Sequence, residues 1–282
     1  MWTEEKLDEL LSTPSDTLVE DMKKIEAVIF DWAGTTVDYG SFAPVQAFIE
    51  AFKKFDVTPT HAEVREPMGM LKWNHIHTMM QMPRISEEWE KVHGKMWELR
   101  DVDAVYKESE TAIFGILDQF STPKPHVLDA VAALRERGIK IGSTTGYTDE
   151  MMSIVVPNAA KQGYEPDAWF SPNAVNNMGR PYPYMVFKNL EALNVSSVGA
   201  AIKVGDTVAD IKEGKAAGMI SVGIIEGSSV MGMMQEEYEA LSAEEKVVHI
   251  ERVRKVYEGC GADYVINNMS ELCDLIDKIE QA

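Results

Sequence analysis

The fold is decided by residues 25–40, Ile-Glu-Ala-Val-Ile-Phe-Asp-Trp-Ala-Gly-Thr-Thr-Val-Asp-Tyr-Gly. An apolar run ends at Phe30, and Asp31 follows it directly, ahead of a turn-rich Ala-Gly-Thr-Thr segment. A short apolar run that passes into a turn predicts a buried strand followed by a loop. We therefore expect the carboxylate of Asp31 at the carboxyl end of a strand, which is where open α/β sheets bind their ligands.

Four further runs of the same kind lie C-terminal to this stretch, at residues 139–144, 201–204, 220–225 and 263–266. Each is next to a segment with helical periodicity, such as the one that carries Val127, Val131 and Leu134 on one face. Strands that alternate with helices favour a parallel sheet that is covered on both faces. The sequence thus predicts an α/β protein with a doubly wound, mostly parallel, Rossmann-like sheet.

Residues 42–119 show a different pattern, because helical spacing occurs there without convincing strands. Phe48, Phe52 and Phe55 are one example. We expect residues 42–119 to form a small helical domain that is inserted into a core made of residues 25–41 and 120–282. The N-terminal residues 1–24 are predicted to form an additional acidic helix, to which the sequence assigns no role.

Composition limits the possible partners and locations. The 282 residues carry a formal net charge of −19, which disfavours binding to nucleic acid. Only two cysteines occur, Cys260 and Cys273, too few for a disulfide framework and compatible with a reducing compartment. The N-terminus lacks the features of a signal peptide, and no run of 18 apolar residues follows, so a cytoplasmic protein without a membrane partner is expected.

Polar residues follow several of the predicted strands and could meet at one edge of the sheet. They are Asp31, the Thr144-Thr145-Gly146 segment, Arg180 in a Gly-Arg-Pro-Tyr-Pro loop, Asp206 and Asp210. Paired carboxylates form the hard oxygen site that Mg²⁺ prefers, and a carboxylate can also attack phosphorus as a nucleophile. The hydroxyl and N–H groups of Thr144, Thr145 and Gly146 would suit phosphoryl oxygens. Any one of these residues alone is more often a turn or cap residue.

Taken together, the order and spacing of Asp31, Thr145, Arg180 and the Asp206/Asp210 pair resemble the haloacid dehalogenase superfamily. The resemblance spans residues 25 to about 282 if the helical insertion is its cap domain. Phosphatases of that superfamily carry a second Asp two residues after the first, as the acid that protonates a leaving alkoxide. Ala33 stands there in this chain. An ordinary phosphomonoesterase would lack its acid here.

The predicted cap offers a different catalytic group. Lys72 lies among Met68, Met70, Leu71 and Trp73, and desolvation by such neighbours lowers the pKa of a lysine so that a neutral amine can condense with an aldehyde. The alternative is a solvated lysine whose stem covers apolar surface, which is the more common arrangement.

Longer motifs favour the catalytic reading of Lys72. Phe-Asp-Trp-Ala-Gly-Thr-Thr at 30–36, Pro-Met-Gly-Met-Leu-Lys at 67–72, Gly-Ser-Thr-Thr-Gly-Tyr at 142–147, Gly-Arg-Pro-Tyr-Pro at 179–183 and Lys-Val-Gly-Asp-Thr at 203–207 resemble the phosphonoacetaldehyde hydrolase family. The resemblance implies hydrolysis of a carbon–phosphorus bond, in the degradation of 2-aminoethylphosphonate. It also implies that Asp31 is the nucleophile and that Lys72 forms a Schiff base.

The same resemblance implies a cofactor and further site residues. Mg²⁺ would be bound by Asp31, the carbonyl of Ala33 and Asp206, and we expect Asp210 to help hold the metal. Met68, Gly69 and His75 match cap positions that line the family's site, and a homodimer through the cap is implied as well. Ser41 stands where some members have cysteine, so a thiol there cannot be essential to this protein.

Several alternatives stay open on the sequence. His75 could relay protons beside Lys72, three residues earlier on one helix face, or it could be a packing residue. A magnesium-dependent phosphomonoester phosphatase or phosphomutase of the same superfamily is the nearest rival function, and Ala33 argues against it. A binding protein that has lost turnover is a rival from another class, which the presence of Asp31 disfavours.

Overall fold

The structure is a computed structural model that describes residues 24–68 and 70–281. The acidic helix expected at the N-terminus lies almost wholly outside these residues. Gly69, expected to bind substrate, also lies outside them.

The described residues form a six-stranded parallel sheet in the order β3-β2-β1-β4-β5-β6. The strands are β1 (Ala27–Phe30), β2 (Lys140–Thr144), β3 (Ala168–Phe170), β4 (Ala201–Gly205), β5 (Ile220–Ile224) and β6 (Tyr264–Ile266). The expectation of a doubly wound α/β core is confirmed, and five strands lie where the sequence predicts them. The strand β3 was not predicted, because its Ala-Trp-Phe sequence contains no β-branched residue that would mark a strand.

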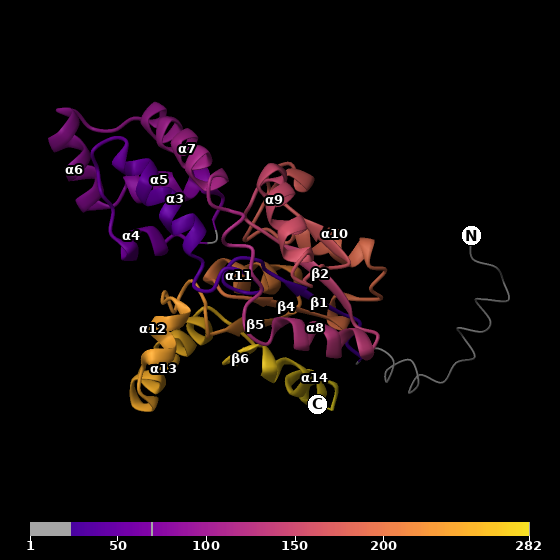
Figure 1. Ribbon diagram of the computed structural model, residues 1–282. Helices are drawn as coiled ribbons and strands as arrows, with labels where there is room; N and C mark the ends of the chain where they lie inside the picture. Colours follow the sequence, from indigo (N-terminus) through magenta and orange to yellow (C-terminus); the bar gives the residue numbers. More distant parts are fainter. Residues whose placement is uncertain (1–23, 69, 282) are drawn as a thin grey trace.

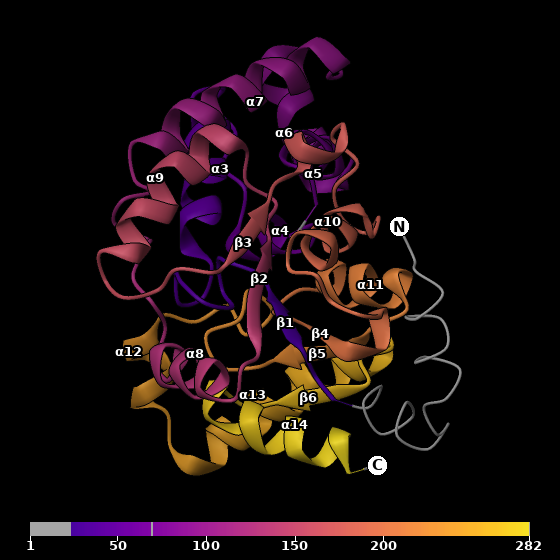
Figure 2. The ribbon, with the colours of Figure 1, turned by 90° about the vertical axis from the view of Figure 1, so that its right-hand side faces the viewer.

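Helices cover both faces of this sheet, and β1 shows why. Val28 and Phe30 point into one hydrophobic cluster, and Ala27 and Ile29 point into another on the opposite face. Among the helices that contribute to the first cluster are α8 (Val127–Glu136), α9 (Asp149–Ala160) and α14 (Leu272–Glu280). The helices α10 (Tyr184–Ala192) and α11 (Val208–Ala217) lie on the other side (Figure 2), and α13 (Ala243–Gly259) packs against α11. The remaining elements of the core are α12 (Gln235–Ala240) and three short 3₁₀ turns, Pro172–Val175, Val198–Ala200 and Met269–Glu271.

The inserted helices form a separate group to one side of the sheet, drawn in indigo and purple in Figure 1. They are α3 (Phe42–Lys53), α4 (His61–Arg65), α5 (Lys72–Met80), α6 (Pro83–His93) and α7 (Leu99–Phe114). Phe48 and Phe52 are buried in a hydrophobic cluster that belongs to these helices alone, and Phe55 packs against it. These helices thus have a hydrophobic cluster of their own, and we refer to them as the cap; the division at residues 42–119 stays a prediction.

The carboxyl ends of the central strands lie under the cap, and the strand order marks where a ligand binds there. The central strand β1 pairs with β2 on one side and β4 on the other, both in parallel. Chains that leave β1 and β4 therefore diverge at the switch point where ligands bind in such sheets. Among the helices of the described residues, none combines the length and the apolar character needed to cross a bilayer.

Candidate active site

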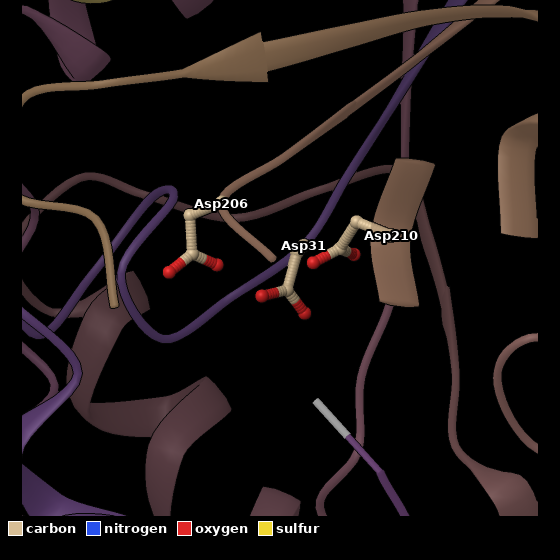
Figure 3. A group of neighbouring side chains, drawn as sticks. All are labelled: Asp31, Asp206 and Asp210. Atoms are coloured by element: carbon tan, nitrogen blue, oxygen red, sulfur yellow. The ribbon is translucent and has the colours of Figure 1, made fainter. Parts of the chain in front are cut away.

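Three carboxylates meet at the switch point. Asp31, Asp206 and Asp210 are buried, and each offers an oxygen such that these atoms lie within 4.8 Å of one another. Figure 3 shows Asp31 leaving the end of β1, Asp206 on the loop after β4, and Asp210 on the first turn of α11. The sequence expectation that these strand ends bring their carboxylates together is met in the structure.

Local backbone geometry holds each of these side chains. The N–H of Asp31 continues the ladder by donating to Val204 O at 3.0 Å. Asp206 accepts from Thr35 Oγ1 at 3.1 Å and from Ser229 N at 2.7 Å. Asp210 is the third residue of a capping box that begins α11 at Thr207.

Gly34 permits the close packing of the loop after β1 against Asp206. Its φ is +84°, and a Cβ at this residue would lie 2.1 Å from Asp206 Oδ2. Only glycine allows both the backbone conformation and the approach.

The electrostatics of the cluster favour a bound cation. Burial raises the pKa of Asp206 well above its usual value, and the neighbouring charges of Asp31 and Asp210 raise it further. Burial also raises the pKa of Asp31, although Arg180 partly opposes this effect. Crowded buried carboxylates of this kind are stabilised by a hard divalent ion, so the donor set fits Mg²⁺.

Arg180 contacts three buried carboxylates. Its Nη2 donates to Asp31 Oδ1 and, at 2.9 Å, to Thr144 Oγ1. Its Nη1 lies 3.2 Å from Asp210 Oδ1, and its Nε donates to Glu213 Oε2 at 3.1 Å. Burial by itself would lower the pKa of Arg180, yet these carboxylates raise it, so the guanidinium stays charged. Arg180 thus holds the carboxylate expected to be the nucleophile.

Two of the expected residues make further contacts that the sequence did not suggest. The Thr144 hydroxyl donates to Glu213 Oε2 at 2.9 Å while accepting from Arg180, and Thr144 is not among the described residues that line the cavity below. Thr144 thus contacts Arg180, and its expected contact with substrate stays a prediction. Asp210 belongs to the cluster, but its oxygens already contact Lys203 Nζ at 2.8 Å and Thr207 Oγ1 at 2.6 Å.

A cavity lies above Asp31, between the sheet and the cap. It is lined by Asp31, Ala33, Ser41, Pro44, Phe48, Met68, Met70, Lys72, His75, Thr145, Gly146, Tyr147, Arg180 and Thr207. The cavity unites most of the residues that the sequence singled out, from both domains. Asp31 and Arg180 of the sheet domain contribute charged groups to the cavity, and Phe48 and Met68 of the cap contribute apolar surface.

Lys72 reaches the cavity from the first residue of α5. Burial lowers the pKa of this amine to about 7, with Glu110 acting weakly in the opposite direction. Its place at a helix N-terminus also disfavours the ammonium form. A substantial fraction of neutral amine is therefore present near neutral pH, as nucleophilic attack on a carbonyl requires.

His75 lies one turn along α5 and stacks on Phe48 with ring centroids 4.2 Å apart. Burial and, to a smaller extent, the charge of Lys72 lower its pKa to about 3, so the imidazole is neutral at physiological pH. Its Nε2 is buried without a hydrogen-bond partner among the described residues. His75 thus combines packing with a ring nitrogen that is available near Lys72.

Sequence reasoning missed several side chains of the site. Tyr147 packs its ring 4.5 Å from Lys72 Nζ, and Glu213 and Lys203 form the buried shell around Arg180. Tyr147 is the last residue of the Gly-Ser-Thr-Thr-Gly-Tyr motif at 142–147, which was the available signal, although no role was assigned to its side chain. Glu213 looks like any acidic residue of an amphipathic helix, so its burial is visible only in the structure.

The chain is similar to a known protein family and to several curated relatives. Residues 25–218 match the family model described as haloacid dehalogenase-like hydrolase. A phosphonoacetaldehyde hydrolase from Lysinibacillus sphaericus is 49% identical over 92% of this chain and 96% of its own length. A bifunctional phosphonoacetaldehyde hydrolase/aminoethylphosphonate transaminase from Clostridioides difficile is 51% identical over 92% of this chain, which spans 40% of that protein.

Solved structures give the same result. A crystal structure of a phosphonoacetaldehyde hydrolase-like protein from Oleispira antarctica superposes with a TM-score of 0.88 at 36% identity, covering 91% of this chain and 93% of the other. A β-phosphoglucomutase from Clostridium difficile has a TM-score of 0.62 at 15% identity, covering 91% and 97% of the two chains. The second likeness concerns the fold alone.

Proposed function

Because the chain belongs to the haloacid dehalogenase-like hydrolases, and within them to the phosphonoacetaldehyde hydrolases, we propose how its cavity hydrolyses the carbon–phosphorus bond of phosphonoacetaldehyde. The products are acetaldehyde and phosphate. The observation that carries the proposal is the presence of Lys72, with its lowered pKa, in the same cavity as Asp31. The pairing joins a carbonyl-reactive amine to a nucleophile for phosphorus.

The first step answers a problem of bond energy. Direct attack on phosphorus would expel an unstabilised carbanion, so the carbon must first be given an electron sink. Neutral Lys72 adds to the aldehyde carbon, and loss of water leaves a protonated imine on Nζ. His75, three residues along the same helix, is the nearby imidazole proposed to relay protons in this condensation.

The second step breaks the carbon–phosphorus bond. A carboxylate oxygen of Asp31 attacks phosphorus, and the bond electrons pass to the carbon and on into the imine, which becomes a neutral enamine. The phosphoryl group is left on Asp31 as an acyl phosphate. Protonation of the enamine carbon and hydrolysis of the resulting imine release acetaldehyde and restore Lys72, while water hydrolyses the acyl phosphate.

Ala33 is accounted for by this route. An enamine leaves instead of an alkoxide, so no acid is required at residue 33. The phosphomonoesterase alternative would need one there. Thr145 and Gly146 line the cavity beside Asp31 and are proposed to bind the phosphoryl oxygens. Met68 lines the same cavity and is proposed to form an apolar wall of the substrate site.

We propose that Mg²⁺ is held by Asp31, Asp206 and the main-chain carbonyl of Ala33. When bound, the metal would offset the charge of the phosphonate and of the carboxylates. Asp210 is proposed to support the site from behind, because its oxygens contact Lys203, Thr207 and Arg180. Arg180 favours the ionised form of Asp31 and orients its carboxylate by the bond from Nη2.

We also propose a cytoplasmic homodimer that associates through the cap. The exposed side chains of Val92, Met96 and Leu99 lie together in sequence at the end of α6 and the beginning of α7, which supports an apolar contact there. Light scattering of the purified chain would show a mass near twice 31.5 kDa. A monomeric mass would remove this part of the proposal.

Borohydride trapping tests the imine. The enzyme is incubated with phosphonoacetaldehyde and Mg²⁺, reduced, digested and analysed by peptide mass spectrometry. We expect an adduct on the peptide that contains Lys72, with loss of activity. Lys72→Arg should abolish both, whereas Lys91→Arg, which changes an exposed lysine of the cap, should leave both intact.

Two outcomes would change the conclusion. An adduct on another lysine would keep the reaction class and overturn the assignment of Lys72. Absence of any adduct, combined with release of phosphate from ordinary phosphomonoesters, would favour the phosphatase or phosphomutase alternative.

A further inference from the structure

The loop at residues 225–233, which follows β5, lies between the carboxylate cluster and the segment that leads into the cap. We call it the Ser229 loop. On one side, Ser229 N donates to Asp206 Oδ2 at 2.7 Å. On the other side, Gly227 O accepts from Gly40 N at 2.8 Å, one residue before the turn into α3 begins at Ser41. The same loop therefore contacts a site carboxylate and the segment that leads into the cap.

Arg65 joins the cap to this loop. It is the last residue of α4, and its Nη1 donates to Gly40 O at 2.7 Å and to Ser229 O at 3.2 Å. Its guanidinium also lies over the Phe42 ring, with Cζ 4.6 Å from the centroid. A single nitrogen of Arg65 thus donates hydrogen bonds to both Gly40 O and Ser229 O.

The two bonds of Ser229 act on the same residue from opposite sides. Its carbonyl receives the hydrogen bond from Arg65, and its N–H gives one to Asp206. Because Asp206 Oδ1 is fixed separately by Thr35, the Ser229 N–H decides how the second oxygen is held. A change in the orientation of Ser229 would turn this carboxylate.

From this chain of contacts, we propose that Arg65 is a positioning residue that couples seating of the cap to the metal-binding orientation of Asp206, through the main chain of Ser229. The inference rests on the proposed function, in which Asp206 is a metal ligand. Arg65 and Lys72 lie on the same cap, seven residues apart in sequence. The cap position that places the amine in the cavity with Asp31 therefore also supplies the support of Asp206.

Arginine suits this position better than lysine. A planar guanidinium can stack on Phe42 while a single edge nitrogen reaches two carbonyls, and it remains charged when partly buried. A lysine ammonium would retain the charge but not the stacking. Arg65→Lys should therefore retain part of the effect, and Arg65→Gln should lose most of it.

Metal affinity is the readout that separates positioning from general stability. Free Mn²⁺ is titrated with the full-length chain and followed by electron paramagnetic resonance, without substrate. Arg65→Gln is expected to weaken Mn²⁺ binding by about 10- to 100-fold, the range for residues that orient a metal ligand, and Arg65→Lys by less. Turnover of Arg65→Gln should recover as Mg²⁺ is raised.

Arg84→Gln is the matched control. Arg84 is an exposed arginine of the same cap, and its ion pairs are with Glu63 at 2.5 Å and Glu88 at 2.6 Å, both within the cap. We expect Arg84→Gln to bind Mn²⁺ with wild-type affinity. This control separates the loss of an arginine from the loss of the Ser229 contact.

Wild-type Mn²⁺ affinity in a folded Arg65→Gln protein would overturn the inference, as would turnover that stays low at every Mg²⁺ concentration. If Arg65→Gln does not fold, the affinity of Arg65→Lys decides between the same two results. Failure of the unaltered chain to release acetaldehyde from phosphonoacetaldehyde would instead count against the proposed function. The two failures are thus distinguishable.

Discussion

Lys72 Nζ of the cap lies 4.5 Å from the centroid of the Tyr147 ring of the sheet domain. The Phe48 ring lies 5.6 Å from the same nitrogen. Aromatic faces attract an ammonium, but they cannot replace its water, so burial still dominates and lowers the pKa of Lys72 to about 7. The contact therefore positions the amine over the sheet domain, in the cavity with Asp31, while leaving it reactive.

The first prediction concerns pH. Reductive alkylation of Lys72 by acetaldehyde and cyanoborohydride should rise with pH through about 7 and then level off, because only the neutral amine attacks. The rate at pH 6 should be about one-tenth of the plateau. Peptide mass spectrometry assigns the modification to Lys72 itself. This matters because Asp38, whose pKa burial raises to about 7, would affect turnover in the same range. An inflection near 10 for Lys72 would contradict the prediction.

The second prediction concerns stability. The pKa of Lys72 is lower in the folded chain than its ordinary value of 10.5, so the unfolded chain binds more protons between pH 7 and 10.5. Folding must then expel a proton, and the stability that this group costs is regained as pH rises. Lys72→Met should raise the free energy of unfolding by about 3 kcal/mol at pH 8, and by about half of that at pH 9.5, while abolishing turnover. Urea denaturation of both proteins measures the difference. A gain that does not change with pH would assign it to packing instead.

The third prediction concerns the acidic shell of Arg180. Glu213→Gln keeps the shape of the side chain but removes a charge that faces Arg180 Nε at 3.1 Å and Lys203 Nζ at 3.6 Å. We expect a loss of about 2–4 kcal/mol in the free energy of unfolding, because two buried cations lose a partner. The value of kcat should fall by at least about 10-fold with little change in KM, since Arg180 holds the nucleophile rather than the aldehyde. Glu258→Gln, on the exposed face of α13, should change neither.

The fourth prediction concerns Gly34. Gly34→Ala places a Cβ 2.1 Å from Asp206 Oδ2, so the carboxylate must move. Mn²⁺ affinity should fall by about 10- to 100-fold. Gly94→Ala is the matched control, because Gly94 also has a positive φ, +69°, but its added Cβ meets nothing within 4 Å. The control should show the backbone strain alone, about 1 kcal/mol of stability, with unchanged metal binding. Equal affinities for the two variants would contradict the role of the close approach.

How much of the fold can be predicted from the sequence depends on how strong the local patterns are. The runs at β1, β2, β4, β5 and β6 are apolar enough to be recognised, and the helical periodicity of residues 42–119 marks the cap. The three residues of β3 were missed, because pairing with β2 rather than their own composition makes them a strand. The position of Asp31 at a strand end follows from the first run alone.

The chain by itself determined the chemistry that is possible: a carboxylate after the first strand, an alanine in place of an acid, and a lysine among apolar neighbours. These are properties of residue type and spacing, so they do not depend on how the chain is folded. Tertiary structure decided which groups meet. It directs Thr144 to Arg180, surrounds Arg180 with Glu213, and places Arg65 of the cap on the Ser229 loop. Burial and distance are properties of the packed molecule, and they turn an ordinary lysine into an amine with a pKa of about 7.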